Sequence, residues 1–448
     1  MVAGGPYGLE DLVHSSGYRN AILILLITPI LWSFPVTLMV SELSSALPEE
    51  GGYYVWVKRG MGPFWGFQEA WLSFVSSIFD MAVYPTLFVY YLAQVWSGAQ
   101  EGNHAILIGI ALIAICVAMN LSGIRLVGAG SLLMTLLVLL PFVFVMAFAL
   151  APHRGAAGHH EVLKKDLLGG ILVAMWNYMG WDNASTIAGE VDRPQRTYPM
   201  AMLASVLLVA ITYILPIAAV SRSGIPAESW ETGSWVAAGR TVGDAVAGPR
   251  VGQALAIAVM AGGMISALSM FNALILSYSR VPLAMAADGF LPKVMGKLSR
   301  KTGVPWVSIL VCAIGWAFCL KLSFLKLLIL DTLFYGLSLL LEFGALIALR
   351  LREPNLPRPY KVPGGIIGCI IISLGPIPVI VVAFIKGLSG EDGVRTGMII
   401  GGIAVVLGAV VYFIIAAVNP RVKARRVLPL ASAFPVITSG SPHEDPMP

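Results

Sequence analysis

Long runs of apolar residues, separated by short polar segments, fill the chain from near its start to residue 418. A helix that crosses a bilayer needs about 20 consecutive apolar residues. This pattern predicts eleven complete spans, at residues 19–47, 64–96, 104–122, 127–150, 166–188, 198–221, 251–280, 304–320, 324–350, 365–386 and 396–418. Ahead of them, residues 4–17 predict half a span that starts at the helix break Gly4-Gly5-Pro6.

Two interrupted helices divide these spans into two sets. One is the segment 4–17, and the other is the span 166–188, where Trp176-Asn177-Tyr178-Met179-Gly180-Trp181-Asp182 interrupts an apolar run. Each is followed by four further spans, so we predict an all-α polytopic membrane protein with a five-plus-five inverted repeat and two peripheral helices. Residues 1–418 are expected to form a single transmembrane transporter domain, and residues 419–448 a disordered cytoplasmic tail.

Composition and charge agree with a membrane protein. The 448 residues are 57% hydrophobic and 12% charged, with a mean hydropathy of +0.82, which excludes a soluble globular domain. Eighteen of the 29 lysines and arginines lie on one side of the predicted spans, mostly in short loops. That side, which includes the C-terminus, is therefore predicted to be cytoplasmic, and we expect a multi-pass protein of the plasma membrane. The basic residues give no indication of nucleic-acid binding.

Acidic residues occur inside the spans without basic partners. Glu69, Asp80, Asp182, Asp331 and Glu342 lie within apolar runs, whereas no lysine or arginine lies deep in any span. A charge at the centre of a bilayer costs about 2.5–3.5 kcal/mol on insertion scales. The excess of acid therefore suggests that a cationic substrate, or protons, supply the missing positive charge.

Asp80 and Asp182 are the strongest candidates for a substrate site. Asp80 lies in the middle of its span, one turn before Tyr84, and Asp182 adjoins the break at Gly180. Glycine allows the backbone to unwind there and to offer amide and carbonyl groups to a ligand. The alternative for either carboxylate is a structural hydrogen bond to a neighbouring span.

The other three acids are open to plainer interpretations. Glu69 lies close to a predicted cytoplasmic end and could be solvated, and Asp331, nearer the outer surface, is assigned a structural or access-path role. Glu342 lies deep among leucines, so it is either a proton-coupling group or a neutral structural donor.

Aromatic residues near these acids could bind an ammonium group. The candidates for such a cage are Trp176, Tyr178, Trp181, Tyr84 and Tyr335. Aromatic belts at membrane interfaces are an alternative, and only Trp181, beside Asp182, stands out from them. We find no motif for a cofactor, a metal, nucleotide hydrolysis or nucleophilic catalysis, so an enzyme is not expected.

At these residues the chain resembles the amino acid/polyamine/organocation transporter superfamily. The likeness is carried by Gly4-Gly5-Pro6, Pro48-Glu49-Glu50-Gly51-Gly52-Tyr53-Tyr54, Ser279-Arg280-Val281-Pro282 and Arg358-Pro359-Tyr360-Lys361-Val362-Pro363. It implies a LeuT-like fold of ten core helices in two inverted repeats plus two peripheral helices. The family pattern also includes half a helix ahead of the first break, and this sequence begins three residues before Gly4.

Within the superfamily the chain resembles polyamine uptake transporters. The similar stretches include Gly4 to Asp11, Gly62 to Gln68, Trp176-Asn177 through Trp181-Asp182 and Leu341-Glu342-Phe343. The resemblance implies proton symport, with Trp181 as an aromatic gate. Related amino-acid carriers typically have asparagine in place of Asp182, which favours an amine over a zwitterion.

These observations predict a secondary transporter that takes up polyamines or related cationic amines with protons by alternating access. The expected substrate-binding residues are Gly4, Gly5, Asp80, Tyr84, Asn177, Trp181, Asp182 and Tyr335. Glu342 is the expected proton-coupling residue, and the expected partners are a small cation, protons and lipid. The alternatives are an amino-acid permease of the same fold and a substrate sensor that does not transport.

Overall fold

The helices of this chain correspond closely to the predicted spans. The computed structural model describes residues 4–122, 124–151, 166–389, 392–419 and 422, and within these ranges every regular element is helical. In this part of the chain, nine helices are long and apolar enough to cross a membrane. Two shorter apolar helices, Leu167–Asn177 and Trp306–Lys321, coincide with the predicted spans 166–188 and 304–320. The predicted tail, 419–448, falls almost wholly outside the described residues.

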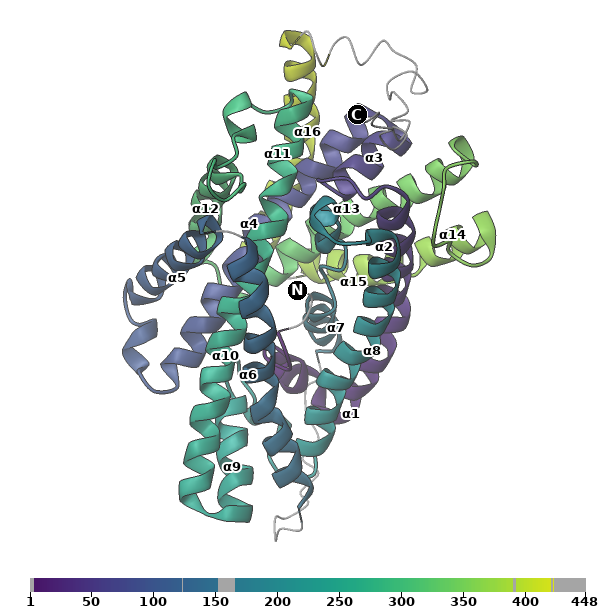
Figure 1. Ribbon diagram of the computed structural model, residues 1–448. Coiled ribbons are helices and arrows are strands. Elements are labelled where there is room, and N and C mark those ends of the chain that lie inside the picture. The colour runs from purple at the N-terminus through teal and green to yellow at the C-terminus, as the bar shows by residue number, and fades with distance from the viewer. Residues whose placement is uncertain (1–3, 123, 152–165, 390–391, 420–421, 423–448) are drawn as a thin grey trace, which may run out of the picture.

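The long helices form one elongated bundle (Figure 1). They are α4 (Pro63–Ala93), α5 (His104–Leu121), α6 (Ile124–Leu150), α8 (Pro194–Val220), α10 (Pro249–Tyr278), α13 (Phe324–Arg352) and α16 (Asp392–Val418). The shorter helices are α3 (Tyr53–Met61), α9 (Trp235–Ala247), α11 (Arg280–Asp288), α12 (Trp306–Phe318), α14 (Gly365–Leu374) and α15 (Pro376–Ser389). Single 3₁₀ turns are η2 (Ser97–Gln100), η4 (Ala227–Ser229), η5 (Lys293–Gly296) and η6 (Cys319–Lys321).

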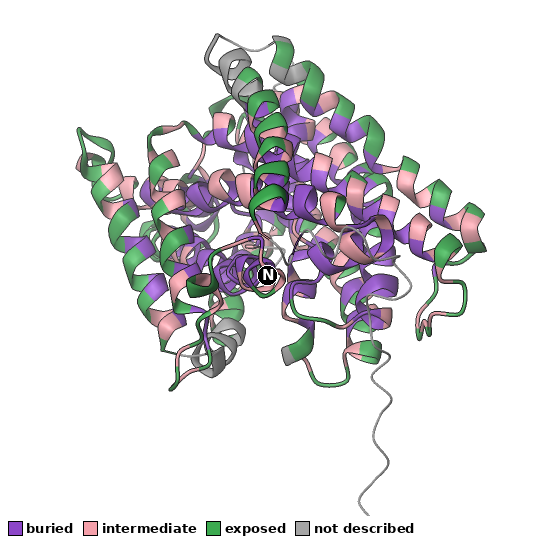
Figure 2. Cartoon of the chain, turned by 90° about the horizontal axis from the view of Figure 1, so that it is seen from above, coloured by how far each residue is buried: buried purple, intermediate pink, exposed green. Residues whose placement is uncertain are grey.

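The outward faces of the bundle are apolar. Buried residues fill its centre, and exposed ones line the outer faces of the peripheral helices (Figure 2). Large apolar side chains are among the most exposed, with Phe318 at 79% and Met200 at 72%. A surface of this kind would aggregate in water, whereas lipid tails solvate it at no cost. The protein is therefore an integral, multi-pass membrane protein.

Glycine geometry ends the short helix that follows the first interruption at Gly4-Gly5-Pro6. Helix α1 (Glu10–Thr28) contains a break at Gly17, whose φ of 75° and ψ of 161° are not helical. A side chain at this position would strain the backbone, so the short helix ends where the sequence predicts. The chain then continues through a π-helical turn, η1 (Pro29–Ser33), into α2 (Phe34–Ala46). Pro29 lacks an amide proton and so interrupts the regular ladder at that turn.

The second interruption lies in the middle of the bundle. Helix α7 (Leu167–Asn177) ends there, and a 3₁₀ segment, η3 (Asn183–Glu190), follows. Gly180 lies between them with a φ of 84°. Side chains satisfy the carbonyls released by the break, because Tyr213 Oη donates to the Asn177 carbonyl at 2.8 Å and Trp181 Nε1 donates to the Tyr178 carbonyl at 2.7 Å.

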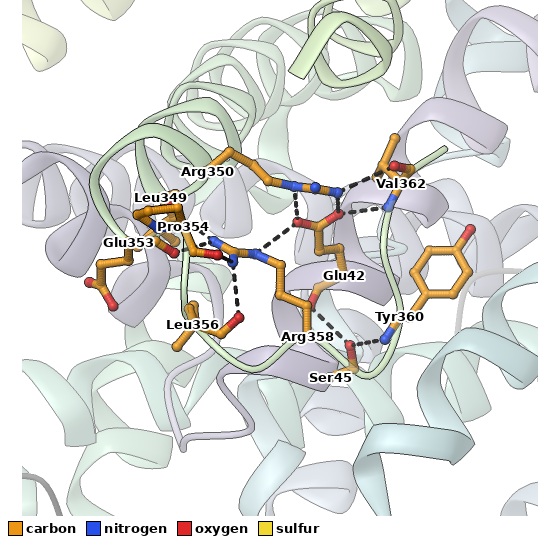
Figure 3. Close-up of polar contacts among 10 residues, drawn as sticks. All are labelled: Glu42, Ser45, Leu349, Arg350, Glu353, Pro354, Leu356, Arg358, Tyr360 and Val362. Carbon is orange, nitrogen blue, oxygen red and sulfur yellow. Dashed lines mark hydrogen bonds and ion pairs between the residues drawn. The ribbon is translucent and has the colours of Figure 1, made fainter. Parts of the chain in front are cut away.

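A buried ion cluster fixes the segment that follows α13 (Figure 3). Glu42, near the end of α2, accepts from Arg350 Nε and Nη2, both at 2.6 Å, and from the Val362 amide at 2.7 Å. Arg358 Nε lies 3.2 Å from the same carboxylate, and its Nη2 donates to the Leu349 carbonyl near the end of α13. The four groups satisfy one another and anchor the 353–362 segment to α2.

Candidate functional site

A narrow cavity lies where α7 unwinds, bordered by α4, α10 and α13. Its volume is about 40 Å³, which is room for a few water molecules. The described residues in its wall include two aspartates and six tyrosines but no lysine or arginine. Of the predicted substrate-binding residues, the wall contains Gly4, Asp80, Tyr84, Asn177 and Tyr335.

Asp80, on α4, receives three hydrogen bonds in this wall. Tyr84 Oη and Trp176 Nε1 donate to its Oδ1 at 3.2 and 3.3 Å, and Tyr278 Oη donates to its Oδ2 at 2.9 Å. The residues come from α4, α7 and α10, so the carboxylate connects three helices around the cavity. Neutral donors orient a carboxylate and reduce its desolvation cost, but they do not cancel its charge.

Tyr278 and Trp176 extend the site beyond the predicted set. Tyr278 ends α10, and its hydroxyl also accepts from Asn183 Nδ2 at 3.3 Å, which joins α10 to the second interruption. The sequence analysis singled out Trp176 as an aromatic candidate but did not single out Tyr278 as a site residue. A tyrosine at the end of a predicted span looks like part of an interfacial belt, so only the folded arrangement distinguishes the two roles.

Asp331, on α13, is buried and lies in the cavity wall. Its Oδ1 accepts from Ser76 Oγ at 2.5 Å, and its Oδ2 has no hydrogen-bond partner among the described residues. Its expected structural or access-path role stays a prediction, and its position in the cavity wall also makes it a candidate for ligand contact. Its spacing of four residues from Tyr335, which lines the same cavity, places both on one helix face and is the sequence signal that was available.

Asp182 lies directly behind the cavity wall. Tyr335 Oη lines the cavity and donates to Asp182 Oδ1, while the Gly180 amide donates to the same hydroxyl at 3.2 Å. Asp182 itself is 2% exposed and is not part of the lining. Its charge therefore reaches the cavity through Tyr335.

The first interruption meets the second through Gly4, Gly8 and Asn177. The Gly4 carbonyl accepts from Ser266 Oγ of α10 at 2.5 Å, and a Cβ on Gly4 would lie 2.4 Å from that oxygen. Asn177 Nδ2 donates to the Val173 carbonyl at 2.9 Å and to the Gly8 carbonyl at 3.4 Å. Side-chain donors therefore satisfy carbonyls at both breaks beside the cavity.

Gly5 and Trp181 lie beside a second cavity. This cavity, of about 470 Å³, shares Gly4, Ser266 and Met270 with the first one. The Trp181 indole donates to the Tyr178 carbonyl, and its residue lines the second cavity and not the narrow one. The structure thus places two of the predicted binding residues in the neighbouring space, and Trp176 in the cavity itself.

Glu342 is isolated from both cavities. Its side chain on α13 is fully buried, and neither carboxylate oxygen has a hydrogen-bond partner among the described residues. It lies within electrostatic range of Asp182 and Glu69. Glu69 is also fully buried and accepts from Ser73 Oγ at 2.6 Å, which contradicts the solvated end expected for it. The two glutamates form an acidic region on the far side of Asp182 from the cavity.

The sequence analysis missed a further buried acid, Glu10. At the start of α1 its Oε2 accepts from the Gly8 amide at 2.7 Å. Its Oε1 accepts from Tyr91 Oη and, at 3.1 Å, from the Gly233 amide in the segment before α9. These contacts close one end of the cavity, where Tyr91 forms part of the wall. An acid in the first turn looks like an ordinary helix cap, so its sequence position gave no signal.

A small polar cavity between interrupted membrane helices defines a class of protein, the solute transporters. The amino acid permease family model matches residues 1–407. The chain therefore belongs to the amino acid permease (APC) family, and it is a multi-pass membrane transporter, not an enzyme.

Relatives within this family carry two kinds of name. Polyamine transporter RMV1 of Arabidopsis thaliana is 34% identical over 382 residues, which are 84% of this chain and 76% of RMV1. Polyamine transporter PUT1 of Oryza sativa subsp. japonica is 33% identical over 385 residues, 85% of this chain and 70% of PUT1. The serine/threonine exchanger SteT of Bacillus subtilis (strain 168) is 24% identical over 342 residues, 73% of this chain and 74% of SteT.

Proposed function

We propose that this protein takes up polyamines or related cationic amines together with protons, by alternating access. The observation that carries this proposal is the charge of the cavity: its described wall includes Asp80 and Asp331 but no basic side chain. Burying carboxylates without counter-ions costs several kcal/mol, which a bound ammonium group offsets. The similarity to two plant polyamine transporters supports the same substrate class.

In this proposal Asp80 and Asp182 attract the ammonium groups. Tyr84 and Tyr335 stack on the aliphatic chain, and the carbonyl groups at Gly4 and Asn177 accept further hydrogen bonds. A polyamine longer than the narrow cavity extends past Ser266 into the second cavity, where Gly5 and Trp181 contact it. The shared wall of the two cavities supports this route.

Alternating access requires the narrow cavity to open in turn toward each side. The narrow cavity, of about 40 Å³, has room for a few water molecules, so we expect it to widen when an organic diamine binds. The contacts of Glu10 with Tyr91 and Gly233 close one end, so we expect them to separate when substrate enters there. This is movement of a few helices and loops about the breaks at Gly5 and Gly180.

Glu342 is the proposed proton-coupling residue. A glutamate with no hydrogen-bond partner in a buried site is stable only when protonated or when a cation approaches. Proton exchange at Glu342 changes the charge near Asp182, which links protonation to substrate binding. The protein is proposed to act in the plasma membrane with a cytoplasmic C-terminus, and no cofactor or nucleic acid takes part.

The test is uptake of labelled putrescine, spermidine, arginine and leucine into proteoliposomes, with and without an inward proton gradient. The proposal predicts saturable putrescine and spermidine uptake that the gradient accelerates. Leucine uptake without competition from any polyamine would contradict it.

An amino-acid permease is the second candidate. The amino acid permease family match and the similarity to a serine/threonine exchanger favour it. In that case leucine or arginine uptake in the same experiment exceeds putrescine uptake, and backbone amides at the first break must bind the substrate carboxylate. Pro6 lacks one of those donors, which weakens this candidate.

A further inference from the structure

The Asp331 carboxylate has hydrogen-bonding capacity that the described residues around it do not use. The side chain is 1% exposed, lines the narrow cavity and has one oxygen, Oδ2, without a hydrogen-bond partner among the described residues. An ionised carboxylate offers about four acceptor positions, and here Ser76 is its only described side-chain donor. A buried acceptor left in this condition is costly, so it requires either a proton or a donor from the cavity.

Asp331 also lies close to Asp80. Its Oδ1 is held by Ser76, and Ser76 is one helical turn before Asp80 on the same face of α4. Side chains four residues apart on a helix are about 5–6 Å apart at Cβ. Both carboxylates line the cavity, and they lie within electrostatic range of each other. Two like charges in one buried cavity repel unless a cation lies between them or one carboxyl takes up a proton.

The donors around Asp80 cannot provide that cation. Tyr84, Trp176 and Tyr278 supply neutral hydrogen bonds to Asp80. The described wall of the cavity has no lysine or arginine that could reach either acid. The two acids therefore form an unneutralised pair that faces the cavity.

We propose that Asp331 and Asp80 form a two-carboxylate subsite for one ammonium group of the substrate, and that this subsite rejects substrates with a carboxylate beside that group. The proposal rests on the proposed function and specifies its substrate class. An alkylammonium has three N–H donors, which match the open oxygen of Asp331 and the remaining acceptor positions of Asp80. The carboxylate of an amino acid would face two like charges in a desolvated site.

Matched ligand pairs test the rejection directly. Agmatine and arginine differ only by one carboxylate, and so do putrescine and ornithine. Binding of each to the purified full chain in lipid nanodiscs is measured by displacement of labelled putrescine. For the wild type we expect agmatine to bind at least about a hundredfold more tightly than arginine.

The Asp331→Asn variant is expected to bind putrescine about tenfold to a hundredfold more weakly, and to narrow the agmatine-to-arginine ratio at least about tenfold. Asp331→Glu keeps the charge and is expected to retain most of the ratio, which separates loss of charge from misfolding. The matched control is Asp192→Asn, an exposed aspartate in the segment before α8, which should leave both values unchanged.

The outcomes distinguish failure of the two-carboxylate subsite from failure of the proposed function. An unchanged ratio in Asp331→Asn, with wild-type putrescine binding intact, overturns the subsite and leaves the proposed function standing. Equal losses in Asp331→Asn and Asp331→Glu also overturn it, because they assign Asp331 a structural role. Absence of putrescine binding in the wild type overturns the proposed function and the subsite together.

Discussion

Two sets of buried carboxylates in this protein differ in how their charge is balanced. Glu42 is fully buried and meets two arginines and a backbone amide within 3.2 Å. Asp331 and Glu342 are equally buried, but each has at least one oxygen with no partner among the described residues. All three side chains are buried carboxylates, and they differ only in the residues that surround them.

This difference separates a structural role from a transport role. The Glu42 cluster neutralises itself, and it joins α2 to the segment after α13 (Figure 3). Burial lowers the pKa of the Arg358 guanidinium in that segment, and the Glu42 carboxylate opposes this shift. The cavity carboxylates lack such counter-ions, so their balance must come from substrate or protons. A cation-binding site needs carboxylates without permanent counter-ions, because an acid already paired with arginine does not bind a further cation.

The largest expected effect is the loss of the Glu42 cluster. Glu42→Gln leaves Arg350 and Arg358 beside a neutral amide, and breaking a buried ion pair costs about 3–5 kcal/mol. We expect a clearly lower apparent Tm of the detergent-purified protein, whether or not putrescine is present. The matched control is Glu353→Gln, because Glu353 also pairs with an arginine, Arg59, but is 33% exposed.

Ion pairs at the surface contribute about 1 kcal/mol or less to stability, so Glu353→Gln should barely shift the Tm. Equal Tm shifts in the two variants would show that the Glu42 cluster contributes no more to stability than a surface ion pair does.

Asp80→Asn should weaken putrescine binding without lowering the Tm. It removes a charge that three neutral donors surround, so the Tm without ligand should stay unchanged or rise. Putrescine affinity should fall about a hundredfold or more, because a buried charge-to-ligand contact is lost. Scintillation proximity binding and a thermal scan on the same preparation check both parts. Unaltered putrescine affinity would contradict the cation-binding role of Asp80.

Glu342→Gln should affect coupling more than binding. It keeps the shape of the side chain but removes proton exchange, so an inward proton gradient should no longer accelerate putrescine uptake. Exchange of internal for external putrescine should continue, because it needs no net proton movement. The two assays are run on one batch of proteoliposomes. Persistence of gradient-driven uptake in this variant would exclude Glu342 as the coupling residue.

Tyr335→Phe is the smallest expected change. It removes the hydroxyl that connects Asp182 to the cavity and accepts from the Gly180 amide. The charge of Asp182 remains, so putrescine affinity should fall by about tenfold, the value of one hydrogen bond to a charged group. A loss as large as that of Asp80→Asn would mean that Tyr335, and not the carboxylates, dominates recognition.

The sequence predicted the helices well because membrane spans depend on local composition. Apolar length alone located the predicted spans, and Gly5 and Gly180 marked the breaks because few other residues adopt their backbone angles. The relation between the two halves as an inverted repeat stays a prediction, since topology alone suggested it.

The site was harder to predict because it depends on contacts between distant segments. Asp80 could be selected by its depth in a span, but the pairing of Asp331 with Ser76 joins residues 255 positions apart. Glu42 also lies within a predicted span but was not among the acids singled out there, and the arginines folded against it distinguish it from Asp331. The position of Trp181 beside the second cavity depends on the path of the unwound segment, which composition does not determine.

The most direct test of this account is calorimetric titration of the purified wild-type protein with putrescine at neutral pH, repeated in the presence of excess spermidine or excess leucine. The account predicts saturable binding of putrescine at one site, abolished by spermidine and unaffected by leucine. Binding of leucine that putrescine does not displace would contradict it.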